Sequence, residues 1–389
     1  MSTLHWHFPT EIAVGEHISQ HLPHYCEQAN IQNPFFVVDP QLLTTPLIQG
    51  LLAPFKPAEN SVFSQFNGEP TEAHITEAIQ ACRSAQHDGV IGIGGGSAID
   101  IAKAIALLTP QPCDLPNDLW AFEDGTVTPP SYPLAPLLPT IAIPTTAGTG
   151  SEVGRSSVIT DSGSQRKRIL FHPDMVPRWV LLDPMLTLSL PTHLTAATGL
   201  DALSHNLEAY CSANYHPMAE AVGLEGIRLI QQFLPVVYQD GQDVQARTQM
   251  LIAASMGATA FQKGLGAMHA LSHTLGATYH QHHGLLNAVL MPYVLCANHR
   301  YLHEKMARLA RYLDLPEQDF RAVLDWILAL RQQLAIPHTL ADLGLNDLDT
   351  QALGEKAHHD PAAQGNPIHL SPSQYSTILE HAMRGTLDI

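Results

Sequence analysis

Two segments in the second half of the chain carry side chains of the types that bind metal ions. Asp201 and His205 are four residues apart, His269 and His273 repeat that spacing, and His283 follows soon afterwards. Residues four apart lie on one face of a helix, so each pair can direct its polar groups to one point. One carboxylate with several neutral imidazoles is an N/O donor set suited to Fe(II), Zn(II) or Mn(II).

The same spacing also has a simpler explanation. An Asp/His pair of this kind often makes only a helix-surface interaction, and a lone histidine is often solvated or satisfied within a core. Here the pairs lie among apolar helical residues such as Ala202 and Leu271, where polar groups are costly unless they are paired or ligated. This context favours a metal site. Gly284, directly after His283, is suited to end a helix.

A glycine-rich turn in the first half has the composition of a phosphate-binding loop. The segment Gly92-x-Gly94-Gly95-Gly96-Ser97 lies between an expected strand and an expected helix. Glycine lets the backbone approach a pyrophosphate, and a helix N-terminus offers free N–H groups and the positive end of the helix dipole. The acidic Asp100, expected in the first turn of this helix, also interacts favourably with that positive end. The spacing is not GxGxxG, and the acidic Asp39 precedes the loop instead of following it. A tight strand–helix turn is therefore the alternative.

A second loop, Thr145-Thr146-Ala-Gly-Thr149-Gly-Ser-Glu152, also follows an expected strand. Ligands of open α/β sheets bind outside the C-terminal ends of the strands, so both loops can face one crevice. A polar surface loop is the alternative. Asp39 can hydrogen-bond ribose hydroxyls and would repel a 2′-phosphate, which favours NAD over NADP, or it can be a turn residue before Pro40.

The elements that must position these residues change type along the chain. The first half alternates expected strands at 35–38, 90–93, 140–143 and 179–182 with expected helices at 75–86 and 98–108. This alternation favours a mostly parallel, Rossmann-like sheet. Helical spacing prevails at 194–211, 217–237, 244–261, 265–279 and 318–334. We therefore expect a dinucleotide-binding α/β domain over 1–185 and an all-helical metal-binding and substrate domain over 186–389.

Composition limits the class of protein. With 389 residues, 45% of them hydrophobic and 14% charged, two globular domains are expected and disorder is not. The 36 acidic residues against 19 basic ones argue against a nucleic-acid or anionic-membrane partner. Residues 1–9 lack the basic and apolar regions of a secretory signal, and the apolar stretch 134–143 is too short to span a bilayer. Five cysteines without a CxxC pair indicate reduced thiols, so we expect a cytoplasmic protein.

Together these motifs resemble the iron-containing (group III) alcohol dehydrogenase family, which has a dehydroquinate-synthase-like fold. The resemblance spans most of the chain. It is carried by Asp39, Gly94–Lys103, Pro144–Glu152, Leu182–Pro184, Gly199–His205, His269–Gly276, His283–Ala288 and Asn366-Pro367. It implies NAD(H)-dependent interconversion of a small alcohol and its aldehyde at a metal, in a homodimer or larger assembly. The family favours Fe(II), although ligand chemistry alone makes Zn(II) at least as good.

The resemblance also implies roles for individual residues. The metal ligands would be Asp201, His205, His269 and His283. His273 would lie near the substrate and pass the released proton toward solvent, whereas His280 and His282 match no ligand position. The dinucleotide site would be lined by Asp39, Gly95, Gly96, Ser97, Asp100, Thr145, Thr146, Thr149 and Lys167, with Asp39 at the adenosine ribose.

Two departures from the family pattern concern the cofactor and the substrate. Glu69-Pro70-Thr71 stands where the family often has Asn-Pro-Thr, and Ser156 falls at a position that many relatives use near the substrate. Beside it, Arg155 is either a surface charge or a contact for an anionic substrate. Other functions remain open: a lyase of the same fold, a hydroxyacid–oxoacid transhydrogenase that keeps NAD bound, or a non-catalytic metal- or nucleotide-binding protein.

Overall fold

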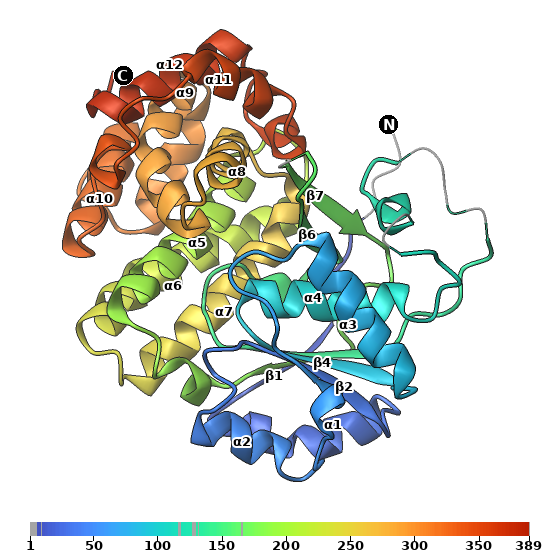
Figure 1. The fold of residues 1–389 in the computed structure, drawn as a ribbon. Helices are drawn as coiled ribbons and strands as arrows, with labels where there is room; N and C mark the ends of the chain where they lie inside the picture. The colour runs from blue at the N-terminus through green and yellow to red at the C-terminus, as the bar shows by residue number, and fades with distance from the viewer. Residues whose placement is uncertain are drawn as a thin grey trace. The chain divides into compact units, whose positions relative to one another are not determined.

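The computed structural model describes residues 6–8, 10–115, 118–126, 130, 132–164 and 166–388. The chain forms two compact units: one comprises Phe8–Thr146 and Gly150–Ser189, and the other Leu190–Ile389 with Ala147–Thr149 and residues 6 and 7. The first unit is built on a parallel sheet and the second is helical, which confirms the expected fold class (Figure 1).

Within the described residues, the first unit contains a six-stranded parallel sheet in the order β1-β8-β5-β4-β2-β3. Its strands are Glu11–Val14 (β1), Pro34–Val38 (β2), Val62–Phe63 (β3), Gly89–Gly94 (β4), Thr140–Pro144 (β5) and Trp179–Leu182 (β8). Its helices are Leu22–Gln28 (α1), Pro46–Leu52 (α2), Glu72–Ser84 (α3) and Gly96–Leu108 (α4). The strands and helices expected from the sequence all occur, with ends shifted by up to three residues.

The inner strands β2, β4 and β5 are buried on both faces of the sheet, as is typical of parallel sheets. Along β2, Phe35 and Val37 pack with residues of α3 and α4, whereas Phe36 and Val38 pack with residues of α1 and α2. Figure 1 shows α1 and α2 on one face of the sheet, and α3 and α4 on the other. The continuous apolar run of β2 follows from burial on both sides.

The sequence pattern does not predict α1, α2 or β3, nor two further features of this unit. One is an antiparallel hairpin formed by Ser156–Asp161 (β6) and Arg166–Phe171 (β7). The other is β1 at the sheet edge, where most side chains are exposed, so burial leaves no apolar run to recognise.

The second unit packs its helices around one apolar core. Its helices are Thr192–Cys211 (α5), Pro217–Gln239 (α6), Val244–Ala260 (α7), Ala267–Tyr279 (α8), His283–Tyr312 (α9), Phe320–Gln333 (α10), Thr350–His358 (α11) and Pro372–Arg384 (α12). The sequence pattern does not predict α9, α11 and α12. In α9 a proline, Pro292, lies inside the helix, and proline normally ends or kinks one.

Short 3₁₀ helices connect these elements. They are Ile18–His21 (η1), Glu59–Ser61 (η2), Leu119–Phe122 (η3), Ser151–Val153 (η4), Pro184–Thr187 (η5), Phe261–Lys263 (η6), Ala341–Leu343 (η7) and Pro361–Gly365 (η8). Over the described ranges, no helix has the length and apolar character needed to cross a bilayer.

Candidate active site

Four side chains from three helices of the second unit meet at one point. Asp201 and His205 come from α5, His269 from α8, and His283 is the first residue of α9. One possible ligand atom from each lies within 4.8 Å of all the others. Asp201, His205 and His269 are buried and His283 is half-buried. The arrangement offers one carboxylate oxygen and three imidazole nitrogens to a common centre.

Hydrogen bonds define which nitrogen of His269 faces this centre. Its Nδ1 lies 2.7 Å from Oε2 of Glu208. An ionised carboxylate only accepts hydrogen bonds, so Nδ1 carries the proton and Nε2 keeps its lone pair. The amide Nδ2 of Asn287 donates to Oδ1 of Asp201 at 2.9 Å and lies 3.3 Å from Nε2 of His269 and 3.2 Å from Nε2 of His283, so its second N–H bond can reach either ring nitrogen. The acceptor atoms of these three side chains therefore converge.

The imidazole of His205 is neutral at pH 7. Burial lowers its pKa to about 4, and the attraction of nearby Asp201 offsets only part of that effect. Its ring is stacked on that of His269, with centroids 4.7 Å apart. Neutral imidazole is the form that ligates metals.

Glycines allow the helices to approach closely enough to bring these residues together. A Cβ on Gly284 of α9 would lie 2.5 Å from the carbonyl oxygen of Ala197 and 2.9 Å from Cβ of Asp201, both on α5. A Cβ on Gly257 of α7 would lie 3.0 Å from Cβ of His205. Hence α9 and α7 must each present a glycine where they pass Asp201 and His205 of α5.

We expect Gly284→Ala to lower both stability and metal affinity. The added methyl group must push α9 away from α5, and overpacking of this kind costs about 1–3 kcal/mol. Urea unfolding and metal titration measure the two effects. The control is Gly50→Ala in α2, where nothing lies within 4 Å of the added Cβ, so stability should be unchanged or slightly higher. Equal behaviour of the two variants would contradict the close-approach argument.

Side chains from other elements hold the N-terminus of α8. Glu208 accepts hydrogen bonds from the backbone N–H groups of Gly266, at 2.9 Å, and Met268, at 2.7 Å, in addition to the one from the side-chain Nδ1–H of His269. Asn366 accepts one from the N–H of Ala267 at 3.2 Å. The sequence reasoning missed Glu208, although it lies one helical turn after His205. It also missed Asn287, which lies four residues after His283.

The other histidines near the cluster of four, His273, His280 and His282, occupy different structural positions. Contrary to the expectation from Gly284, the preceding helix ends at Tyr279, with His280 at its C-cap in the left-handed conformation (φ 54°). Gly284 instead lies in the first turn of α9, which His282 caps through its Nδ1. His273 lies beside the cluster of four, its ring stacked on that of His283 with centroids 5.3 Å apart.

In the first unit, the two predicted loops meet at the C-terminal ends of β2, β4 and β5. The N–H of Asp39 donates to the carbonyl of Ile93 at 3.0 Å, and that of Thr145 donates to the carbonyl of Gly94 at 3.0 Å. Gly94 has a φ of 153°, and a Cβ there would lie 3.0 Å from Cβ of Asp39. A Cβ on Gly95 would lie 3.5 Å from the side chain of Thr146.

The predicted cofactor residues differ in how far other protein groups engage them. Gly95 is the N-cap residue of α4, and Gly96 and Ser97 are its first two residues. No side-chain hydrogen bond caps this helix end. By contrast, the side chains of Asp100 and Lys167 already interact with other protein groups. Asp100 accepts hydrogen bonds from Ser151 Oγ and the N–H of Val158 and pairs with Lys103, while Lys167 pairs with Glu69 at 2.7 Å. Thr149 lies in the short stretch that belongs to the helical unit. Glu69, the departure from the family pattern, thus serves as the ion-pair partner of Lys167.

The cluster of four fits a divalent cation by its donor chemistry. Three imidazoles and one carboxylate supply nitrogen and oxygen atoms, and the carboxylate would partly neutralise the charge of the ion. The Glu208–His269 hydrogen bond is the outer support that metal-bound histidines commonly have.

Comparison with known proteins identifies the family. Residues 9–184 match the model of the iron-containing alcohol dehydrogenases, and residues 195–383 match the C-terminal model of that family. Relatives include 4-hydroxybutyrate dehydrogenase of Cupriavidus necator, 35% identical over 92% of this chain and 94% of that protein. NAD-dependent methanol dehydrogenase of Bacillus methanolicus is 31% identical over 92% of this chain and 94% of its own length.

Solved structures support the same assignment. The crystal structure of a 1,3-propanediol oxidoreductase matches with a TM-score of 0.91 and 29% identity, covering 98% of this chain and all of that one. The match therefore extends over both units of the fold. The chain therefore belongs to the iron-containing alcohol dehydrogenase family and is an oxidoreductase of the alcohol dehydrogenase type.

Proposed function

We propose that this enzyme interconverts a small alcohol and its aldehyde with NAD(H), using Fe(II) held by Asp201, His205, His269 and His283. The observation that carries the proposal is the convergence of these four side chains within 4.8 Å. Family membership supports the class of reaction, and the NAD-dependent methanol dehydrogenase among its relatives supports the cofactor.

The residues around the proposed metal centre would have different roles in the reaction. When bound, the metal supplies Lewis-acid chemistry at the substrate oxygen and the nicotinamide exchanges the hydride. Asp201, His205, His269 and His283 would hold this ion, which would act on the oxygen of a bound substrate. Glu208 keeps the Nε2 lone pair of His269 directed at the ion. His273, beside the ligands, accepts a hydrogen bond from the substrate hydroxyl.

The loops of the first unit would hold the dinucleotide. Gly95, Gly96 and Ser97 present the N-terminus of α4, where backbone N–H groups favour a pyrophosphate. Thr145 and Thr146 follow the adjacent strand and add hydroxyl groups to the same edge of the sheet. Ligands bind at such edges in open α/β sheets. Because Lys167 and Asp100 already pair with protein groups, we assign them a supporting role as the lining of this site.

Asp39 would set the preference for NADH over NADPH. We expect Asp39→Ala to raise the KM for NADH about 10-fold through loss of a charged hydrogen bond. The KM for NADPH should fall, because repulsion of the 2′-phosphate is removed. Initial rates with each cofactor measure the change. Asp174→Ala, which removes an exposed acid of the same unit, serves as the control. An unchanged cofactor preference in Asp39→Ala would show that Asp39 is only a turn residue.

An NADH-oxidation screen tests the proposed function. Aldehydes, ketones and 2-oxo acids are offered to enzyme treated with chelator and then supplied with Fe(II) or Zn(II) under anaerobic conditions. We expect turnover of an aldehyde that is lost with chelator and restored by Fe(II). Metal uptake without NADH consumption on any substrate would overturn the catalytic assignment. Full activity with Zn(II) and indifference to Fe(II) would overturn the choice of metal.

The screen should include an aldehyde that carries a terminal carboxylate. One relative is named for 4-hydroxybutyrate, and the guanidinium of Arg155 lies 5.3 Å from the ring centroid of Phe171 without an ion pair to any described residue. Burial lowers the pKa of Arg155. If Arg155 contacts the substrate, Arg155→Ala raises the KM for this aldehyde and not for an uncharged one.

Transhydrogenation is the second candidate within the family fold. Such an enzyme would keep NAD bound and need no free cofactor, so a rate independent of added NADH would identify it. We further propose a cytoplasmic location and a homodimeric or larger assembly. The five cysteines, which are all buried and free, support a reducing compartment. Light scattering during size-exclusion chromatography tests the assembly.

A further inference from the structure

His273 has a carboxylate partner that sequence spacing does not predict. Its Nδ1 lies 3.1 Å from Oδ2 and 3.2 Å from Oδ1 of Asp360. Asp360 is far away in the sequence, at the N-cap of η8. Both side chains are mostly buried, with exposed fractions of 15% and 14%. Because an ionised carboxylate only accepts hydrogen bonds, the contact places a proton on Nδ1 of His273.

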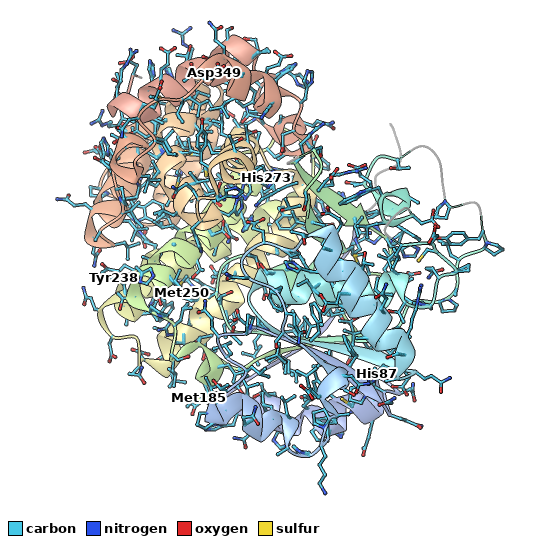
Figure 2. All side chains as sticks on the ribbon, viewed as in Figure 1. His87, Met185, Tyr238, Met250, His273 and Asp349 are labelled. Atoms are coloured by element: carbon cyan, nitrogen blue, oxygen red, sulfur yellow. The ribbon has the colours of Figure 1, made fainter. Side chains whose placement is uncertain are left out.

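This contact leaves the other ring nitrogen available. No described residue forms a hydrogen bond with Nε2 of His273, and the ring does not belong to the group of four ligands. The ring nevertheless packs against that group: it is stacked on His283, and its centroid is 5.9 Å from that of His269. Figure 2 shows His273 at the position of α8 in the helical unit.

The carboxylate is itself held in place by the protein. Oδ1 of Asp360 accepts a hydrogen bond from the N–H of Ala362 at 2.9 Å. At the other end of η8, Gly365 passes so close to Gly264 that a Cβ would lie 2.9 Å from the Gly264 carbonyl carbon. The next residue, Asn366, caps α8 at the N–H of Ala267 and exchanges hydrogen bonds with Asn298. The segment 360–366 is thus fixed to α8, the helix that carries His273.

From this geometry we propose that Asp360 is a positioning residue for the reaction. It holds the His273 ring in the tautomer with Nδ1–H, so that Nε2 is the acceptor for the substrate hydroxyl. Without it, the ring can rotate about its side-chain bonds or place its proton on Nε2, and either change removes the acceptor. The inference rests on the proposed function, since it assigns a partner to the residue that contacts the substrate.

A double-mutant cycle tests this role. We expect Asp360→Ala to lower kcat about 10- to 100-fold, which is the range for loss of a hydrogen bond to a charged group. Metal content and the KM for NADH should stay at wild-type values, because Asp360 contacts neither a ligand nor the nucleotide loops. His273→Ala should lower kcat at least as far. In the His273→Ala background, adding Asp360→Ala should cause no further loss, since residues that act as one unit are not additive.

Two further variants separate positioning from structural support. Asp360→Asn keeps Oδ1 for the N–H of Ala362 but removes the charge and replaces Oδ2, the oxygen nearer to Nδ1 of His273, with an NH2 donor. We therefore expect kcat to fall, less than in Asp360→Ala, at unchanged thermal stability. Asp349→Ala removes an equivalent N-cap, that of α11, where Oδ1 accepts from the N–H of Ala352 at 3.0 Å. Figure 2 shows Asp349 at the outer edge of the helical unit, away from His273. This control should keep its kcat.

The outcomes distinguish the possible failures. A further 10-fold or greater loss of kcat on adding Asp360→Ala to His273→Ala would show that Asp360 does not act through His273, and would overturn the inference. Wild-type kcat in Asp360→Asn, or in His273→Ala, would do the same while leaving the metal- and NAD-dependent reaction intact. Absence of any NADH-linked turnover by the wild-type enzyme would instead refute the proposed function.

Discussion

Replacing His269 by alanine is expected to abolish metal binding and to lower aldehyde reduction by about 1000-fold or more, because the charge stabilisation lost with the ion is worth several kcal/mol. His269 is buried between Glu208 and the cluster centre, so no solvent-exposed group can take its place. NADH binding should persist, since Gly95, Gly96, Ser97, Thr145 and Thr146 belong to the other unit. Metal analysis by mass spectrometry, NADH fluorescence titration and initial rates measure the three quantities.

A matched variant controls for the loss of an imidazole. His303→Ala makes the same change on α9, the helix that begins with His283, but at an exposed position outside the cluster. It should retain metal and activity. If His269→Ala also kept a full complement of metal and wild-type turnover, the four side chains would not form the metal centre.

The second large effect is expected from Glu208→Gln, which we predict to weaken metal binding about 10- to 100-fold, the usual consequence of losing an outer-shell partner. Glu208 accepts hydrogen bonds from three N–H groups: those of Gly266 and Met268 and the Nδ1–H of His269. Glutamine offers one oxygen and one NH2 group, so it cannot satisfy all three donors. Either a buried N–H loses its partner, or His269 moves its proton to Nε2 and no longer offers a lone pair to the ion.

The two consequences of Glu208→Gln can be measured separately. Titration of apoenzyme with metal should show the weaker binding, and excess metal should restore part of the activity. Thermal unfolding reports the unpaired donor at the start of α8. Glu355→Gln is the control, because Glu355 also hydrogen-bonds a histidine, His359 at 3.1 Å, but on an exposed helix surface. Wild-type metal affinity combined with reduced stability in Glu208→Gln would mean that Glu208 only caps the helix.

The sequence predicts much of the fold because the signals involved are local. Strand β2 and helix α4 appear as an apolar run and a helical repeat, and both are found within two residues of their expected ends. Elements with weak local signals are missed: β1 exposes most of its side chains, and α9 contains Pro292. Where burial does not impose a pattern, or where tertiary packing overrides a helix breaker, sequence periodicity carries no information about the element.

By itself, the sequence determined which side chains could act together on one helix. Asp201 and His205 share a face of α5 because a helix repeats every 3.6 residues, and the order of the motifs identified the family. Glu208 lies on the same helix and was within reach of the same argument.

The tertiary structure alone decided how groups from different segments meet. The approach of α9 to α5 depends on Gly284, which the sequence reasoning took for a helix end. The contact between His273 and Asp360 joins residues 87 positions apart. Such contacts arise from the packing of whole helices and loops, and this packing depends on shape and burial summed over the unit. No local spacing encodes it, so the hydrogen bond between His273 and Asp360 became visible only in the folded chain.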